Sequence, residues 1–310
     1  MPTLPIPLPA GAVVLVTGAN GFIGHRICLR LAQAGTDTRA MVRQAGALPS
    51  AAAHITELVA SWDDPDALAA AMVGVTHVVH CFAIAGPDHD AAVRVNVEGT
   101  RVILDAAAAA SVQRVVHIST TSVVSPHALV IDDLAELADD AAGPYSVTKR
   151  DGEVVVAQAQ AAGLDTVILR PPAVLGWGES STWGQKFPVW VRDGAMPFAP
   201  DPRACLGWVF VDDFADAIAS ALTAPDATGN TYVIASGTAT WGAYMTEVLS
   251  WLDDVADPLV PGDEIPPIRR WSSERAATDL GWTPTHTFAE AMAESAPHHR
   301  STTPTGAAPT

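Results

Sequence analysis

Short apolar runs alternate with helical patterns of apolar residues from Val13 to Arg170. The first run, Val13–Thr17, is mostly β-branched, and the stretch 22–31 after it repeats apolar residues at helical spacing. Continuous β-branched runs are typical of strands buried on both faces, so the pair predicts a strand followed by a helix. Further strands are expected at 38–42, 54–59, 75–80, 114–118 and 166–169, and further helices at 65–72, 91–110 and 144–162. This alternation predicts an α/β fold with a doubly wound parallel sheet.

A glycine-rich turn joins the first strand to the first helix. Gly18, Gly21 and Gly24 follow the strand at intervals of three residues. Glycines in this arrangement allow a tight turn, a close approach of backbone to a pyrophosphate, and close packing of the helix on the strand. The N–H groups in the first turn of a helix have no partner within it, so they can bind an anion. The context predicts a dinucleotide site in a Rossmann domain. The alternative is a turn that binds nothing.

The pattern changes after Arg170. Prolines and glycines interrupt residues 171–207, and eight of the nine tryptophans lie from Trp177 onward. A strand at 208–211, a helix at 212–222 and a strand at 231–234 are expected to return to the first domain. The predicted organisation is a dinucleotide-binding domain over 1–175 with 208–235, a smaller C-terminal substrate lobe over 176–207 and 236–295, and a flexible tail over 296–310. Most tryptophans are expected in the core of this lobe, but Trp177, Trp183 and Trp208 are candidates for the wall of an apolar substrate pocket.

Composition narrows the possible partners. The chain has 310 residues, 49% of them hydrophobic, and its net charge of −17 opposes binding to nucleic acid or to an anionic membrane. Its three cysteines show neither a disulfide framework nor the spacing of a zinc site, so no metal is expected. The proline-containing N-terminus does not resemble a secretory signal, and no apolar run is long enough to span a bilayer. These features predict a protein of the cytoplasm.

Tyr145 and Lys149 are the first candidates for chemistry. They lie four residues apart in an expected helix, so the phenol and the ammonium share one face. A nearby cation favours the phenolate and lowers the pKa of a tyrosine, which a general acid–base group working near neutral pH requires. An exposed aromatic–cation pair without a catalytic role is the alternative interpretation.

Hydroxyl groups follow the strand expected at 114–118, in the run Ser119–Thr120–Thr121–Ser122. At the carboxyl end of a strand they can bind a developing alkoxide in the ligand crevice, although such a run can also be a simple turn. Four other positions have structural interpretations: His80 as a hydrogen-bonded core residue, Cys81 as a small apolar filler, and the acidic pair 212–213 as a cap of the next helix.

Eight short motifs follow one another along the chain: TGANGFIG at 17–24, HCFA at 80–83, NVEGT at 96–100, HISTTS at 117–122, YSVTK at 145–149, LRPPAVLG at 169–176, VFVDD at 209–213 and DLGWTP at 279–284. In this order they resemble the extended short-chain dehydrogenases/reductases, the superfamily of NAD(P)-dependent epimerases and dehydratases. The resemblance is nearest to the branches of dihydroflavonol reductase and 3β-hydroxysteroid dehydrogenase.

The resemblance implies roles for individual residues. Tyr145 would donate or accept the proton, and Lys149 would lower its pKa and hold the nicotinamide ribose. Thr121, third in the hydroxyl run, would bind the substrate oxygen, with Ser122 and Ser119 as alternatives. Asn96 would be a structural or water-holding residue near the site. The cofactor-binding residues are expected to be Gly18, Asn20, Gly21, Phe22, Ile23, Arg43, Trp62, Ala83, Lys149 and Pro171.

The end of the second strand bears on the choice between NAD and NADP. An NAD site usually has an acidic residue there, but this chain has Val42 followed by Arg43. A guanidinium suits a 2′-phosphate, so NADP(H) is favoured and NAD(H) is possible, unless Arg43 is only a solvated loop residue. Ser61 stands where members of the family usually have an Asp, which leaves recognition of the adenine less defined.

Three functions compete. The favoured one is an NADP-dependent carbonyl reductase or alcohol dehydrogenase acting on a small apolar or aromatic ketone, aldehyde or secondary alcohol. The second is a sugar-nucleotide epimerase or dehydratase with bound NAD, but Ala173 and Leu206 occupy the positions of the Asn and Arg that would hold a diphosphate, unless Arg192 or Arg203 replaces them. The third, a regulator without turnover, does not explain the Tyr–Lys pair. The family geometry would also bring the helices at 91–110 and 144–162 into the four-helix interface of a homodimer.

Overall fold

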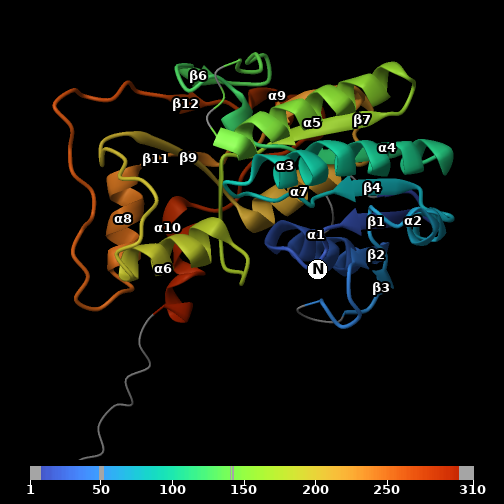
Figure 1. The fold of residues 1–310 in the computed structure, drawn as a ribbon, viewed down its shortest axis with the longest axis horizontal. Coiled ribbons are helices and arrows are strands. Elements are labelled where there is room, and N and C mark those ends of the chain that lie inside the picture. Colours follow the sequence, from blue (N-terminus) through green and yellow to red (C-terminus); the bar gives the residue numbers. More distant parts are fainter. Residues whose placement is uncertain (1–7, 49–51, 140, 142, 300–310) are drawn as a thin grey trace, which may run out of the picture.

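A seven-stranded parallel sheet forms the centre of the molecule (Figure 1). Its strand order is β10-β7-β5-β4-β1-β2-β3, and every neighbouring pair is parallel. The chain winds from β1 outward to β3, and then from β4 on the other side of β1 outward to β10. The predicted doubly wound α/β sheet is therefore confirmed.

The computed structural model describes residues 8–48, 52–139, 141 and 143–299. The main sheet consists of β1 (Val13–Thr17), β2 (Asp37–Val42), β3 (Ile55–Val59), β4 (His77–His80), β5 (Arg114–Ile118), β7 (Thr166–Arg170) and β10 (Thr231–Val233). The helices around it are α1 (Phe22–Gln33), α2 (Pro65–Met72), α3 (His89–Ala92), α4 (Gly99–Ala109), α5 (Gly143–Ala161) and α7 (Val211–Ala221).

Alternating side chains of the strands bury two apolar layers. In β1, Val14 and Val16 belong to the layer that contains residues of α1 and α7, and Leu15 belongs to the layer that contains residues of α2, α4 and α5. A strand presents successive side chains to opposite faces, so a continuous apolar run fits only a sheet covered on both sides. This requirement explains why the strands of the sequence could be recognised without alternation of polar and apolar residues.

The helix expected at 91–110 is not continuous. A π-helical turn, Val93–Glu98, separates α3 from α4. The Asn96 amide donates to the Ile84 carbonyl at 2.9 Å and to Thr148 Oγ1 at 3.0 Å, and its oxygen accepts the Ile84 N–H at 2.9 Å. A Cβ on Gly152 of α5 would lie 2.9 Å from the Asn96 carbonyl oxygen, so a glycine allows this close packing. The side chain of Asn96 thus has a structural role.

A second, three-stranded sheet lies beside the first. It pairs β9 (Cys205–Phe210) in parallel with β8 (Ala173–Leu175) and antiparallel with β11 (Gly237–Thr240). The strand expected to return to the main sheet at 208–211 therefore lies in this smaller sheet. A further pair joins β6 (Val130–Ile131) to β12 (Arg270–Trp271). The remaining helices are α6 (Phe187–Arg192), α8 (Trp241–Leu249), α9 (Glu274–Leu280) and α10 (Phe288–Ala293).

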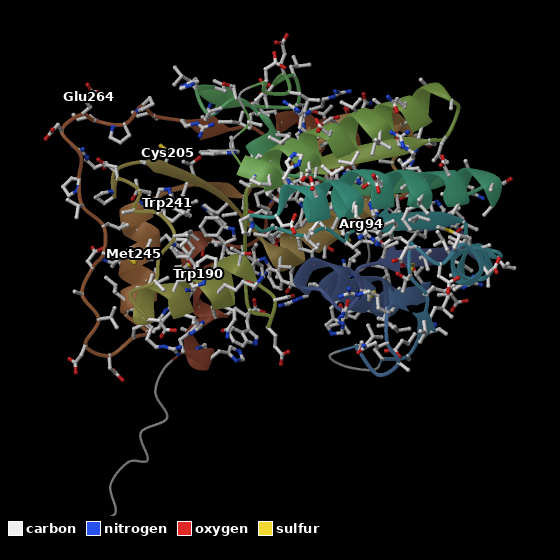
Figure 2. The ribbon with its side chains drawn as sticks, in the orientation of Figure 1. Arg94, Trp190, Cys205, Trp241, Met245 and Glu264 are labelled. Atoms are coloured by element: carbon white, nitrogen blue, oxygen red, sulfur yellow. The ribbon has the colours of Figure 1, made fainter. Side chains whose placement is uncertain are left out.

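Aromatic side chains fill the space between α6 and α8. The ring of Phe187 lies 5.5 Å from both Trp183 and Trp241 and 5.7 Å from Tyr244. Figure 2 labels Trp190, Trp241 and Met245 in this region, on the side of the molecule away from the main sheet. Of the eight tryptophans from Trp177 onward, three are buried, and three more are partly buried against the same apolar core: Trp208, Trp251 and Trp282, and Trp183, Trp190 and Trp241.

The end of the described chain is packed rather than free. A short 3₁₀ helix covers Ala296–His298, and the His298 ring stacks on Trp177 at 3.8 Å. His299 Nε2 lies 2.7 Å from the Gly184 carbonyl oxygen. The prediction of a flexible tail is wrong for 296–299, and residues 300–310 lie outside the described part. Among the described helices, none is long and apolar enough to cross a membrane.

Candidate active site

The glycine turn has the backbone geometry that only glycine tolerates. Gly18 has a φ of +65°, and a Cβ there would lie 2.8 Å from the backbone nitrogen of Phe82. A Cβ on Gly24 would lie 2.2 Å from the Gly18 carbonyl oxygen. No side chain caps the start of α1. The turn and the open helix end therefore fit the pyrophosphate of a dinucleotide.

A cavity of about 870 Å³ extends from this turn along the carboxyl ends of the strands to the second sheet. Ligands of open α/β sheets bind in this place. The cavity contains seven of the ten residues expected to bind the cofactor: Gly18, Gly21, Phe22, Ile23, Ala83, Lys149 and Pro171. It also contains Tyr145 and the whole hydroxyl run 119–122, so the predicted catalytic residues lie together.

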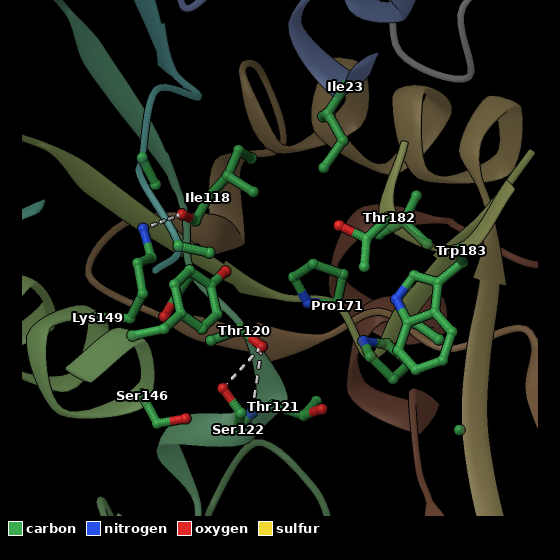
Figure 3. A pocket seen from close by; sticks show the side chains of 18 of the residues that line it. Ile23, Ile118, Thr120, Thr121, Ser122, Ser146, Lys149, Pro171, Thr182 and Trp183 are labelled. Carbon is green, nitrogen blue, oxygen red and sulfur yellow. Dashed lines mark hydrogen bonds between the residues drawn. The ribbon is translucent and has the colours of Figure 1, made fainter. Parts of the chain in front are cut away.

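Lys149 points its ammonium group at the end of β5 (Figure 3). Its Nζ donates to the Ile118 carbonyl at 2.6 Å and lies 3.4 Å from His117 Nε2. Burial lowers the pKa of Lys149 to about 8, although the nearby Glu153 opposes the shift. The group therefore begins to lose its charge just above neutral pH.

Tyr145 lies one helical turn before Lys149 on α5 and is half-buried. Burial raises the pKa of its phenol to about 12, and a hydrogen bond with Thr120 opposes the shift only in part. This direction is opposite to the one expected from the neighbouring lysine. The ammonium is directed at the Ile118 carbonyl, and its charge does not offset the burial of the phenol.

The four hydroxyl groups after β5 have different partners. Ser119 donates to Glu153 and is buried, so it is not available to a substrate. Thr120 donates to Ser122 Oγ at 3.2 Å and accepts the Ser122 N–H at 3.2 Å, as Figure 3 shows. Among the described residues, the hydroxyl of Thr121 has no hydrogen-bond partner. Thr121 thus leaves its hydroxyl open to the cavity's ligand, and Thr120, which sequence reasoning missed, shares a hydrogen bond with the phenol of Tyr145.

A buried ion pair supports this part of the site. Arg170 Nη2 at the end of β7 lies 2.7 Å from Glu153 Oε2, and Arg170 Nη1 donates to the Ala135 carbonyl at 2.9 Å. Glu153 stands one turn after Lys149 on α5 and also accepts from Ser119. The pair thus connects α5, β5 and β7 directly behind the reactive groups.

His80 is a buried, hydrogen-bonded core residue, as the sequence predicts. Thr17 Oγ1 lies 2.9 Å from its Nδ1, and Thr100 Oγ1 lies 3.0 Å from its Nε2. Burial and the Lys149 charge lower the pKa of His80 to about 3, so the ring is neutral at physiological pH. Cys81, also expected as a filler, lines the cavity, and burial raises the pKa of its thiol.

The acidic pair at the start of α7 does not cap that helix, contrary to the prediction. Asp212 pairs with Arg26 at 2.9 Å, and Asp213 accepts hydrogen bonds from Thr285 at 2.7 Å and from the backbone of His286 at 3.2 Å. These contacts tie α7 to α1 and to the segment before α10. The described residues contain no group of three or more His, Cys, Asp or Glu side chains that could hold a metal.

Three expected cofactor residues, Asn20, Arg43 and Trp62, lie outside the cavity, and Arg43 is exposed. Arg43 and Arg94 nevertheless lie near the segment after β3. The Ser61 hydroxyl and, more weakly, these two guanidinium groups lower the pKa of Asp63. Two cations thus lie near the region where the adenosine of a dinucleotide would be expected (Arg94 is labelled in Figure 2).

The part of the cavity away from the glycine turn is mainly apolar. Trp183 lines it as expected, and Trp271, which was not singled out, does so too. Trp177 packs on His298 and Trp208 is buried, so neither contributes. Both Ala173 and Leu206 line the cavity. Arg192 and Arg203 do not, and each pairs with an aspartate of its own loop, Asp193 or Asp201.

Known proteins share this sequence pattern and this fold. The profile of the NAD dependent epimerase/dehydratase family matches residues 14–235. The chain is 31% identical to the 4-hydroxy-2-methyl-3-oxo-4-farnesyl-3,4-dihydroquinoline-1-oxide ketoreductase of Stigmatella aurantiaca, over 54% of this chain and 51% of that protein. It thus spans about half the length of that relative. It is 29% identical to the 2-alkyl-3-oxoalkanoate reductase of Stenotrophomonas maltophilia, over 72% of this chain and 70% of that protein.

A solved structure is similar over nearly the whole chain. It is a short-chain dehydrogenase/reductase superfamily protein from Agrobacterium tumefaciens with bound NAD. The TM-score is 0.74 at 27% sequence identity, and the match covers 92% of this chain and 96% of the other.

Proposed function

The chain belongs to the NAD dependent epimerase/dehydratase family, and from that premise we propose that it is an NADP-dependent carbonyl reductase or alcohol dehydrogenase. The family consists of NAD(P)-dependent enzymes of the short-chain dehydrogenase/reductase type. The observation that carries the proposal is one cavity that contains the glycine turn, Tyr145, Lys149 and Thr121. Its substrate is a ketone, an aldehyde or a secondary alcohol.

When bound, the nicotinamide supplies or accepts the hydride. Thr121 donates a hydrogen bond to the substrate oxygen, and Tyr145 transfers a proton to or from that oxygen. Thr120 holds the phenol in place. Lys149, whose ammonium lies beside the Ile118 carbonyl, binds the ribose and provides a positive charge near the phenol.

NADP is the proposed cofactor because an arginine, not an acidic residue, follows the second strand, and a second arginine lies near the segment after β3. Arg43 comes directly after β2, and the charges of Arg43 and Arg94 both act on Asp63. A 2′-phosphate is a strong acceptor for charge-assisted hydrogen bonds from guanidinium groups.

A reductase is favoured over a sugar-nucleotide epimerase because small or apolar side chains of the cavity occupy the two positions from which a diphosphate would be held. Ala173 and Leu206 line it, and Arg192 and Arg203, which could replace the missing polar groups, lie outside. Two relatives are named as a ketoreductase and an oxoalkanoate reductase, which supports the same choice.

We further propose a homodimer in the cytoplasm. Helices α4 and α5 lie next to each other on one face of the sheet, and Val154 of α5 is 46% exposed there. An apolar side chain in this position suits a helical interface between two copies. The three cysteines are free, as a reducing compartment requires.

The test is a titration of the purified protein with NADPH and with NADH, followed by a panel of aromatic ketones and of UDP- and dTDP-sugars. Tight NADPH binding and loss of NADPH absorbance on a ketone are expected. Retained NAD and conversion of a sugar nucleotide without net oxidation would instead assign the protein to the epimerases.

A further inference from the structure

Arg269 is a cation in the wall of the cavity, at the end formed by the second sheet. It precedes β12 in the chain, and its backbone N–H lies 3.4 Å from Cys205 Sγ at the start of β9. Figure 2 labels Cys205 in this region. The Nε of Arg269 donates to the Ala128 carbonyl at 2.9 Å, and the guanidinium carbon lies 5.3 Å from the centre of the Trp271 ring. The guanidinium is therefore held in one place before any ligand binds.

In the part of the chain that the structure describes, this guanidinium has no carboxylate partner. Among the described residues, neither of its terminal nitrogens has a hydrogen-bond acceptor, and burial lowers the pKa of Arg269. Its neighbours in sequence and space are paired: Arg270 with Glu274, and Arg203 with Asp201. A half-buried charge without a counter-ion is costly, and an anionic ligand would remove that cost.

The other charged side chains that line the cavity are also positive. Among the residues that the structure describes, no Asp or Glu lines the cavity, although the chain has 34 of them. Both lysines of the protein, Lys149 and Lys186, do line it. Lys149 is directed at the Ile118 carbonyl. Lys186 is exposed and lies on the segment before α6. In a chain of net charge −17, this distribution favours entry of an anionic ligand into this one cavity.

A glycine makes room for the aromatic platform below the guanidinium. A Cβ on Gly207 of β9 would lie 2.4 Å from the Trp271 ring. Any larger residue would displace Trp271 and with it the face on which Arg269 lies. We call the unit formed by Gly207, Trp271 and Arg269 the anion pocket. It lies beside the second sheet, at a distance along the chain from the glycine turn that would hold the cofactor.

We propose that the substrate carries a carboxylate, which Arg269 binds in the anion pocket while an apolar or aromatic body packs along Trp271. This inference rests on the proposed carbonyl reductase function. The two free Nη groups of one guanidinium match the two oxygens of one carboxylate. On β9, the neighbouring Leu206 and Gly207 offer no polar side chain to a second anionic group.

The experiment compares a keto acid with its neutral ester in the wild-type protein and in Arg269→Gln. Para-acetylbenzoate and its methyl ester have the same ketone and ring and differ in charge and in one methyl group. We expect the wild type to prefer the acid in kcat/KM, and Arg269→Gln to lose about 10-fold to 100-fold on the acid and little on the ester, as loss of charge-assisted hydrogen bonds implies. Arg269→Lys should retain part of the preference.

Arg270→Gln is the matched control, because it removes the same charge from the next residue, which is exposed and paired with Glu274. It should leave the preference unchanged. Equal losses on acid and ester in Arg269→Gln, or no preference for the acid in the wild type, would overturn the inference.

A binding measurement separates this inference from the proposed function. Calorimetric titration of the protein with para-acetylbenzoate, with its methyl ester and with UDP-glucose requires no turnover. Binding of the acid that weakens in Arg269→Gln supports the carboxylate even if no ketone is reduced, a result that would contradict only the reductase proposal. Tighter binding of UDP-glucose than of the acid, or acid binding unaffected by the substitution, would contradict the carboxylate.

Discussion

The ammonium of Lys149 donates a hydrogen bond to the carbonyl oxygen of Ile118 at 2.6 Å, and so it is directed at the end of β5 rather than at an acidic partner. Helix α5 and the strand that leads to the hydroxyl run are joined by this contact. The lysine is buried beside this carbonyl and a neutral His117, and Glu153 favours its charged form. The chemical consequence is a cation that titrates close to physiological pH.

Activity should depend on the charge of Lys149. Its pKa is lowered from 10.5 to about 8, so the ammonium becomes a neutral amine as the pH rises through that value. We expect kcat/KM, which reports the free enzyme, to fall about tenfold per pH unit above about pH 8. Initial rates between neutral and alkaline pH measure this. In Lys149→Arg, whose side chain stays charged, the residual activity should show no such fall. If the variant still loses activity above about pH 8 as the wild type does, the fall belongs to the titration of another group.

Replacement of Tyr145 by Phe should abolish turnover. The proton donor is lost while the ring remains, and general acid–base catalysis is typically worth about 10²-fold to 10⁴-fold. The affinity for NADPH should stay within about twofold because the hydroxyl contributes little to cofactor binding. Stopped-flow reduction of a ketone measures the loss of turnover, and equilibrium titration with NADPH measures the affinity for the cofactor. Activity close to that of the wild type would reject the acid–base role.

Two neighbouring threonines should have separable effects. Thr121→Val removes the hydroxyl proposed to bind the substrate oxygen, and we expect kcat to fall by about 10²-fold, as for the loss of one oxyanion donor. Thr120→Val removes the partner of the Tyr145 phenol, so burial acts on the phenol unopposed and the pKa that controls the acid–base step should rise. Steady-state kinetics across pH for both variants distinguish them. A larger kcat loss in Thr120→Val than in Thr121→Val would exchange the two assignments.

Discrimination between NADPH and NADH should depend on Arg43. Arg43→Glu places a carboxylate where the 2′-phosphate is proposed to lie, and KM for NADPH should rise about 10-fold to 100-fold while KM for NADH changes little. Arg101→Glu, on the exposed surface of α4, makes the same change of net charge and serves as the control. If both variants raise KM for NADPH equally, the effect comes from the net charge of the protein and not from Arg43.

The Glu153–Arg170 pair should contribute to stability. Glu153→Gln leaves the buried Arg170 guanidinium without a counter-ion, and we expect a loss of about 3 kcal/mol in the free energy of unfolding. Urea unfolding followed by circular dichroism measures it, with Glu136→Gln, an exposed position, as the control for the charge change. A loss below about 1 kcal/mol, typical of a surface pair, would show that the pair is not essential to the packing.

The local sequence determined the main sheet and the position of the reactive groups along it. A strand buried on both faces needs a continuous apolar run, a turn with positive φ needs Gly18, and two side chains four residues apart share a helix face. Each of these rules acts within a few residues, so each leaves a pattern that can be recognised without knowing what lies across the fold.

The tertiary structure alone decided how the remaining groups are used. Ser119 is occupied because Glu153 lies opposite it, Thr120 reaches Tyr145 from another element, and the π turn at Asn96 forms where α5 approaches at Gly152. Arg269 and Trp271 lie some 250 residues after the glycine turn, yet they line the same cavity. Contacts of this kind depend on how distant segments pack, and no pattern of apolar and polar residues within one segment records them.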